Sequence, residues 1–217
     1  MMKRFGLPVA LLVIFAMTRL PWLMPPNFSA VYAIAFCAGV YFPGRQAWWV
    51  PFTLIFASDC LLDLHYWLDL GINPFGISML LSRMANYAAF AAIIALGRCF
   101  KKNTPWVGLV GGGLLSAVIF YLVTNCMSWL ALKDYPKTLA GLVQALTIGL
   151  PGWPHTWEFF RNTLTSSGLF AGLFTAAMKV REKLETAPEA EEAEAEESEE
   201  RPEGAMSPGN VPAEHAE

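Results

Sequence analysis

Eight residues with charged or amide side chains interrupt the apolar stretches of this sequence or lie at their ends. They are Arg19, Asp59, Asp63, Arg83, Asn86, Asn125, Glu158 and Arg161. Ionisable groups inside membrane segments are costly, so they usually face the interior of a helix bundle, where they pair with one another or line a path for a ligand. We therefore predict that these eight residues bind a ligand.

The spacing of the polar residues supports this prediction, because residues three or four apart share one face of a helix. Such faces are formed by Asp59 with Asp63, by Ser82 with Asn86, by Tyr121, Asn125 and Ser128, and by Glu158, Arg161, Asn162 and Thr165. If the faces converge, they form a polar chamber. Its roof would contain Asn27, Asn73, residues 138–150, Trp153, His155 and Trp157.

Two other interpretations of these residues stay open. The charged residues can form an internal ion-pair network that only fixes helix packing. Glu158 and Arg161 lie at the start of a segment, where side chains anchor helices at the membrane boundary as readily as they line a pocket.

No pattern in the sequence predicts catalysis or a metal site. Asp59 and Asp63 share a face, but no H-x-x-x-H or Cys/His spacing accompanies them, and the chain has neither a G-x-S-x-G motif nor a phosphate-binding loop. Cys37, Cys60, Cys99 and Cys126 lie in apolar segments without C-x-x-C spacing, which favours helix packing over a disulfide. We expect a protein that is not an enzyme and that has no cofactor, metal or nucleic-acid partner.

The composition places most of the chain in a membrane. Of 217 residues, 55% are hydrophobic and only 15% are charged, against about 25% charged in a soluble domain. Residues 1–178 contain 11 basic and 5 acidic residues, a net charge of +6, whereas residues 179–217 contain 4 and 13, a net charge of −9. We predict a transmembrane domain over residues 1–178 and a cytoplasmic tail over residues 179–217.

Six apolar segments are candidates for crossing a hydrocarbon core about 30 Å thick, which takes about 20 residues of helix. They are Phe5–Leu23, Phe28–Phe42, Ala47–Leu64, Ile77–Leu96, Val107–Leu132 and Trp157–Met178, of which the second is short. A seventh stretch, Thr138–Leu150, is too short to cross and ends at Pro151-Gly152-Trp153-Pro154. We predict an all-α membrane protein with six transmembrane helices and an interfacial or re-entrant helix before the last one.

Basic residues set the orientation, because short loops rich in Lys and Arg stay cytoplasmic. Six crossings place nine basic residues on one side, namely Lys3, Arg4, Arg45, Arg98, Lys101, Lys102, Lys179, Arg181 and Lys183, and only Lys133 and Lys137 on the other. Both termini are then cytoplasmic, and the eight polar residues fall in the outer half. Arg19 and Pro21 lie where a signal peptide would have its cleavage site, so we expect the first segment to be an uncleaved helix.

The tail is strongly acidic. Residues 185–203 contain ten glutamates among Ala, Ser and Pro. Such a segment cannot bury a core, so we predict that the tail is disordered, either as a solvating tail or as a docking arm for a basic partner.

Several polar positions, taken in order along the chain, match a known family. Pro26-Asn27-Phe28-Ser29, Ser58-Asp59, Thr124-Asn125, Tyr135 and Thr138-Leu139-Ala140-Gly141 resemble a family of small bacterial inner-membrane proteins known as a domain of unknown function. The resemblance covers residues 5–178. It implies a polytopic protein of the bacterial inner membrane, and it carries no activity with it.

The layout is also similar to the S components of energy-coupling-factor transporters, which are six-helix proteins with cytoplasmic termini and an outward-facing ligand pocket. Our first hypothesis is therefore a transport subunit that captures a small polar or amphipathic solute and works with a membrane partner subunit. The alternative is a structural or scaffold subunit of a membrane complex, whose polar residues form a packing network and whose tail docks a partner.

Overall fold

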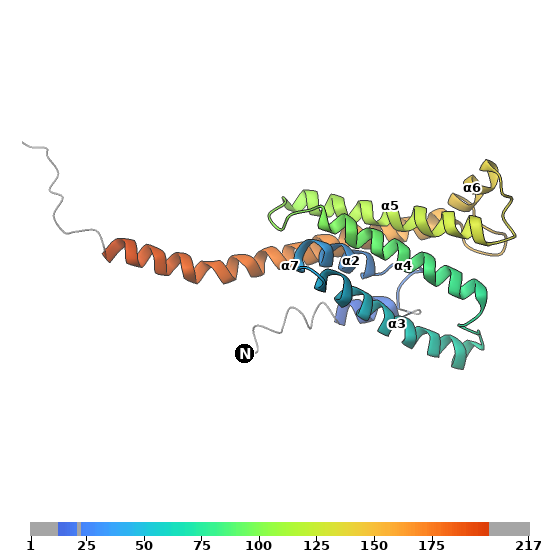
Figure 1. Cartoon of the computed structure of the whole chain (residues 1–217), viewed down its shortest axis with the longest axis horizontal. Helices are drawn as coiled ribbons and strands as arrows, with labels where there is room; N and C mark the ends of the chain where they lie inside the picture. The colour runs from blue at the N-terminus through green and yellow to red at the C-terminus, as the bar shows by residue number, and fades with distance from the viewer. Residues whose placement is uncertain (1–12, 21–22, 200–217) are drawn as a thin grey trace, which may run out of the picture. The chain divides into compact units, whose positions relative to one another are not determined.

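The structure is a computed structural model that describes residues 13–20 and 23–199, with side chains as far as residue 183. The chain divides into two compact units, Met1–Ala177 and Met178–Glu217. Within the described residues every regular element is a helix, which confirms the all-α prediction. Six helices follow the helical residues 13–19: α2 Val31–Tyr41, α3 Gln46–Leu70, α4 Ile77–Arg98, α5 Trp106–Ala131, α6 Leu139–Leu146 and α7 Thr156–Glu199 (Figure 1).

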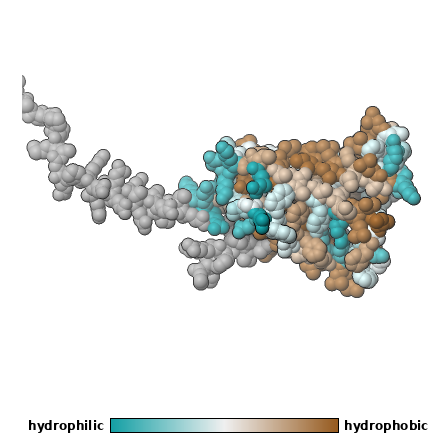
Figure 2. All heavy atoms as spheres, in the orientation of Figure 1, coloured by the Kyte–Doolittle hydropathy of each residue, from teal (hydrophilic) through white to brown (hydrophobic). Residues whose placement is uncertain are grey.

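Three of these helices, α3, α4 and α5, are long and apolar enough to cross a membrane, with 25, 22 and 26 residues. They contain the predicted segments Ala47–Leu64, Ile77–Leu96 and nearly all of Val107–Leu132. Large apolar side chains such as Trp49, Leu61 and Leu68 of α3 are mostly exposed, as suits a surface that lipid covers. Figure 2 shows that hydrophobic residues cover most of the visible face of the first unit.

Helix α2 is shorter than the predicted crossing Phe28–Phe42. Its 11 residues rise only about 17 Å, roughly half the hydrocarbon thickness. All of them except Ile34 are buried, so α2 lies inside the first unit. The chain before it contains Pro25 and Pro26 and is not helical, because the residue before a proline is disfavoured in the α conformation.

The start of α2 is held by hydroxyl groups. Thr18 Oγ1 accepts a hydrogen bond from the Ala30 amide at 3.1 Å, and Ser29 Oγ accepts one from the Val31 amide at 3.3 Å. These bonds satisfy backbone donors that have no partner within the helix. The bond from Ala30 to Thr18 also ties the helical residues 13–19 to the start of α2.

Glycines let the helices touch at two places. A Cβ on Gly39 of α2 would lie 2.3 Å from the carbonyl oxygen of Ile94, and one on Gly97 of α4 would lie 2.3 Å from that of Phe36. In α5, the carbonyl oxygen of Gly113 accepts a 2.6 Å hydrogen bond from Ser167 Oγ of α7. Small residues of this kind allow close packing of membrane helices.

The predicted interfacial or re-entrant segment contains α6, which has only eight residues and rises about 12 Å. Thr138 caps its start, since Thr138 Oγ1 accepts a 3.2 Å hydrogen bond from the Gly141 amide. The turn between α3 and α4 and helix α6 lie at the same end of the first unit (Figure 1).

The acidic segment differs from the prediction of disorder. Helix α7 continues to Glu199, so residues 179–199 are helical, and residues 200–217 lie outside the described residues. Ala, Glu and Lys are strong helix formers, so the segment can be helical even though it cannot bury a core. The predicted N-terminal residues 5–12 also lie outside the described residues.

Candidate functional site

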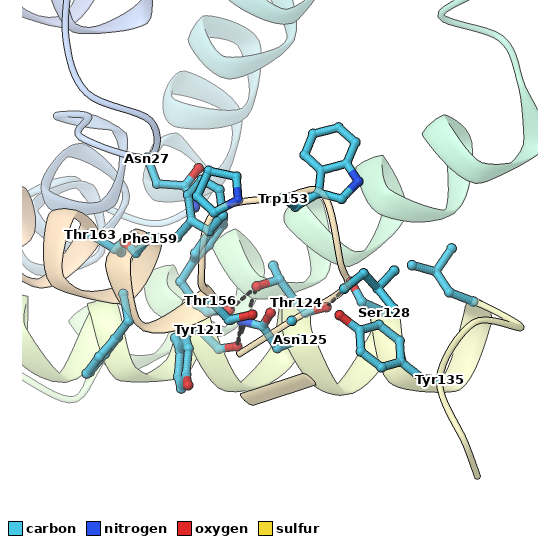
Figure 3. A pocket seen from close by; sticks show the side chains of 16 residues that line it. Asn27, Tyr121, Thr124, Asn125, Ser128, Tyr135, Trp153, Thr156, Phe159 and Thr163 are labelled. Atoms are coloured by element: carbon cyan, nitrogen blue, oxygen red, sulfur yellow. Dashed lines mark hydrogen bonds between the residues drawn. The ribbon is translucent and has the colours of Figure 1, made fainter. Parts of the chain in front are cut away.

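A cavity of about 330 Å³ lies in the first unit, where α5 ends and α7 begins. Its walls come from α5, from the corner after α5, from the loop before α7 and from the first turns of α7. The lining residues are Asn27, Phe120, Tyr121, Thr124, Asn125, Ser128, Leu132, Tyr135, Gly149, Leu150, Trp153, Pro154, Thr156, Phe159, Phe160 and Thr163 (Figure 3).

The wall from α5 is one face of that helix. Tyr121, Asn125, Ser128 and Leu132 follow one another at intervals of three or four residues, so their side chains point the same way. The Asn125 amide donates to the carbonyl oxygen of Tyr121 at 2.8 Å, and Ser128 Oγ donates to that of Thr124 at 2.9 Å. Bonds to the preceding turn fix both side chains against their own helix.

The wall from α7 is largely aromatic. Phe159 and Phe160 lie on its second turn, and Thr163 follows one turn later. The ring of Phe160 packs on the ring of Tyr121 with centroids 4.4 Å apart, which joins the α7 wall to the α5 wall. In Figure 3, Asn27 and Trp153 lie across the cavity from the α5 residues.

The loop before α7 takes its shape from Gly149. This residue has a φ of +73°, which favours glycine, and a Cβ there would lie 2.8 Å from Thr156 Oγ1. Gln144 of α6 holds the loop, because its carbonyl oxygen accepts from the Gly149 amide at 2.8 Å and its side chain donates to the Gly149 carbonyl at 3.1 Å. The loop therefore presents Leu150 and Trp153 to the cavity in a fixed shape.

The corner after α5 is held by two side chains. Trp129 Nε1 donates to the carbonyl oxygen of Pro136 at 2.9 Å, and Lys137 Nζ donates to that of Leu132 at 2.6 Å. A lysine at this place satisfies carbonyl groups that the end of a helix leaves without partners. Tyr135 belongs to this corner, and burial, with a smaller contribution from the nearby Asp134 carboxylate, raises the pKa of its phenol above its ordinary value.

Among the described residues that line this cavity, none is an Asp, Glu, Lys, Arg or His. The wall consists of aromatic rings, hydroxyl groups, the two amides of Asn27 and Asn125, and the apolar residues Leu132, Gly149, Leu150 and Pro154. Such a mixture of aromatic surface with a few polar groups is typical of small-molecule sites.

The charged residues form a separate network. Arg19 forms an ion pair with Asp59 of α3, and its Nε also donates to Ser58 Oγ at 3.1 Å. The second carboxylate oxygen of Asp59 accepts from the Tyr87 hydroxyl of α4 at 3.1 Å. The helical residues 13–19, α3 and α4 are thereby joined around one carboxylate.

A second ion pair joins α3 to α4. Arg83 Nη2 lies 2.6 Å from Asp63 Oδ1, one helical turn from the first pair on α3. The side chains are 27% and 18% exposed, so they are only partly accessible. The two ion pairs compensate their charges between neighbouring helices. They form the kind of internal ion-pair network that was the alternative interpretation of these residues.

The structure therefore does not bring the eight predicted residues together. Asn125 lines the cavity between α5 and α7, which we call the neutral cavity because its described lining has no charged side chain. Asp59, Asp63 and Arg83 lie in the ion-pair network instead. Arg19 belongs to that network and also lines a second cavity of about 310 Å³ beside Tyr32, Tyr66 and the segment 24–29. Three predicted residues are found in neither cavity lining nor network: Asn86 and Glu158 are partly buried, and the exposed Arg161 places its guanidinium 5.4 Å from the Trp157 ring.

Sequence analysis missed part of the neutral cavity. It found Asn125, and it expected Tyr121, Ser128, Asn27 and Trp153 near the chamber. The missed residues include Thr124, Tyr135, Thr156, Phe159, Phe160 and Thr163. The spacing of Thr156, Phe159, Phe160 and Thr163 on one helical face is a signal that could have identified the α7 wall.

The cysteines and the acidic residues add no further site. Cys37, Cys60, Cys99 and Cys126 are free thiols, so the disulfide that the sequence did not favour is absent at these four positions. Within residues 13–20 and 23–183, whose side chains the structure describes, no group of three or more His, Cys, Asp or Glu side chains is arranged to hold a metal ion.

Comparison with known proteins gives one match. Residues 1–189 match a family described as a family of unknown function, DUF6580. No curated protein and no solved structure matches the chain, so the likeness to S components receives no support from these comparisons.

Proposed function

Because the chain belongs to this family of unknown function, DUF6580, we propose from its own geometry that it is an integral membrane protein that captures a small solute in the cavity between α5 and α7. One observation carries the proposal. The cavity has the volume and the mixed aromatic and polar wall of a small-molecule site, and the loop beside it is held by specific hydrogen bonds.

The proposed topology has six crossings of the bacterial inner membrane, with both termini in the cytoplasm. Helices α3, α4 and α5 supply three of them. The segment before α2 together with α2, the segment 5–23 and the first part of α7 supply the others. Irregular backbone at membrane depth is tolerated where protein buries it or where it lines a cavity, and residues 24–29 line the second cavity.

This topology makes the neutral cavity open toward the outside of the cell. The basic residues Arg45, Arg98, Lys101 and Lys102 lie near the opposite ends of the helices, which the positive-inside rule assigns to the cytoplasm. A solute captured from outside would be released inward through helix movement driven by a membrane partner subunit.

The proposal is tested by native mass spectrometry of the protein extracted mildly from its own membrane. We expect a stoichiometric small molecule on the wild-type protein and its loss in Asn125→Leu. Arg161→Gln is the matched control, because Arg161 is polar and lies on α7 but does not line the cavity. Absence of any small molecule from the folded wild-type protein would contradict capture.

A scaffold role predicts a different result in the same experiment. A stoichiometric protein partner would remain bound without a small molecule, and deletion of residues 185–217 would release it if the tail docks that partner. Capture in the cavity predicts that this deletion leaves small-molecule retention unchanged, because the residues that line the cavity all fall between Asn27 and Thr163.

A further inference from the structure

The α5 wall of the neutral cavity offers hydrogen-bond acceptors. Thr124 Oγ1 donates to the carbonyl oxygen of Phe120 at 2.8 Å, Asn125 Nδ2 to that of Tyr121 at 2.8 Å, and Ser128 Oγ to that of Thr124 at 2.9 Å. Each hydroxyl has a single hydrogen, so Thr124 and Ser128 have no donor left, and each keeps oxygen lone pairs. Asn125 Nδ2 carries two N–H groups, of which the bond to Tyr121 uses one, so this wall offers several acceptors and one amide donor. A ligand that meets it binds best when it brings N–H or O–H donors of its own.

The lining has no charge to neutralise a charged ligand. The Asp59 and Asp63 carboxylates already pair with Arg19 and Arg83, and neither carboxylate lines the neutral cavity. A carboxylate or phosphate placed beside Thr124, Asn125 and Ser128 would meet mostly lone pairs and no positive charge, so its loss of hydration would be poorly compensated. An ammonium group would find acceptors but no counter-charge, so it too would lose hydration at a cost.

Aromatic rings form the two ends of the remaining space. Tyr121 and Phe160 pack together at one end with centroids 4.4 Å apart, and Trp153, which is 74% exposed, lies across the cavity (Figure 3). Such faces favour flat rings in offset or edge-to-face contact. The volume of about 330 Å³ is at the lower end of the range for ligand sites and limits the ligand to one small molecule.

Resting on the proposed function, we propose that the captured solute is a small uncharged molecule that carries a flat ring and donates hydrogen bonds through an amide, amine-type N–H or hydroxyl group. Its donors meet Thr124, Asn125 and Ser128, and its ring lies against the aromatic residues of α7 and of the loop. Carboxylates and phosphates bind poorly, because the described lining holds no positive charge and its α5 wall offers mostly acceptors.

Four probes of nearly equal size test this assignment on the full chain in detergent. Benzamide is neutral and flat, benzoate replaces the donor amide with an anion, benzylammonium carries a cation, and cyclohexanecarboxamide keeps the amide but lacks the flat ring. Dissociation constants come from saturation-transfer NMR titrations of each probe. The same titrations are run on Asn125→Leu, on the milder Ser128→Ala and on the control Arg161→Gln.

We expect benzamide to bind at least about tenfold more tightly than benzoate and benzylammonium, since an uncompensated charge costs well over 1.4 kcal/mol. Benzamide should also bind severalfold more tightly than cyclohexanecarboxamide. Asn125→Leu and Ser128→Ala should weaken benzamide, and Arg161→Gln should not. The two cavity variants are compared with the wild type only if they are folded. An elution volume equal to that of the wild type establishes this for each variant.

Two results would overturn the assignment in distinguishable ways. Tighter or equal binding of benzoate, benzylammonium or cyclohexanecarboxamide, with the same dependence on Asn125 or Ser128, would refute the uncharged flat ligand and leave capture in this cavity standing. The assignment is also refuted if Asn125→Leu and Ser128→Ala leave the binding of all four probes unchanged, or if no probe binds. If the protein from the native membrane then carries no small molecule either, capture is refuted as well.

Discussion

Two polar regions of the first unit differ in where their charged and hydrogen-bonding side chains find partners. Between the helical residues 13–19, α3 and α4, every charge discussed above has a partner of opposite charge on another element. Between α5 and α7 the polar groups are neutral, and the Thr124 and Ser128 hydroxyls and one N–H of Asn125 are bonded to their own helix while the oxygen atoms of these side chains face a cavity. The first arrangement joins helices, and the second leaves hydrogen-bond acceptors open to the cavity.

Charged side chains inside a membrane domain can pair with one another instead of lining a cavity. A charge in a medium of low dielectric requires compensation, and an opposite charge on a neighbouring helix supplies it within the chain. Neutral hydroxyl and amide groups cost less to leave open, so they can line a cavity that waits for a ligand.

Removal of one charge from the network should have the largest effect. Asp59→Asn leaves the Arg19 guanidinium partly buried without its counter-charge, and we expect a loss of about 3 kcal/mol in the free energy of unfolding. Unfolding in mixed micelles measures it. The double variant Arg19→Met/Asp59→Leu should recover most of the loss, because no unpaired charge remains; a double variant as unstable as Asp59→Asn would contradict the account of the network.

The second ion pair should be worth less. Arg83→Met leaves Asp63 without its partner, but the pair is one turn nearer the end of α3, and Arg83 is 27% exposed where Arg19 is 19% exposed. We expect a loss of about 2 kcal/mol, reduced by the partial exposure. The same unfolding experiment checks it, and a loss larger than that of Asp59→Asn would reverse the proposed order of the two pairs.

The cavity should respond to mutation in the opposite way. Asn125→Leu removes the amide oxygen from the wall but breaks only a local bond to Tyr121, so we expect less than about 1 kcal/mol of change in stability. Binding of benzamide should fall about tenfold. A stability loss comparable to that of Asp59→Asn, with benzamide binding unchanged, would show that Asn125 stabilises helix packing and does not bind a ligand.

A charge outside both regions should have the smallest effect. Arg161→Gln removes a guanidinium that lies 5.4 Å from the Trp157 ring, and exposed contacts of this type contribute about 0.5–1 kcal/mol. We expect a change in unfolding free energy of that size and unchanged benzamide binding. Reduced binding would show that the cavity extends to the surface of α7 beyond its present lining.

Periodicity was sufficient to predict the helices α3, α4 and α5, because their apolar runs are long and interrupted by few charges. It was not sufficient for α2. The run from Phe28 to Phe42 contains no charged residue, but the prolines at 25 and 26 and the hydroxyl caps from Thr18 and Ser29 set where the helix begins. The cap from Thr18 comes from another segment of the chain, so no local pattern reveals it.

The site was only partly predictable for a related reason. Helical spacing shows that Asp59 and Asp63 share a face, but not that Arg19 and Arg83 lie opposite them. Whether a charge lines a pocket or pairs with another helix depends on which helices are neighbours, and that is a property of the fold. Asn125 was found because its stripe with Tyr121 and Ser128 is complete within one helix.

The most direct test compares three proteins extracted mildly from the native membrane and analysed by native mass spectrometry. These are the wild type, Arg19→Met/Asp59→Leu and Asn125→Leu. The account predicts a stoichiometric small molecule on the wild type and on the double variant, and its loss from Asn125→Leu. Loss of that molecule from the folded double variant together with its retention by Asn125→Leu would contradict the account and return the ligand to the charged residues.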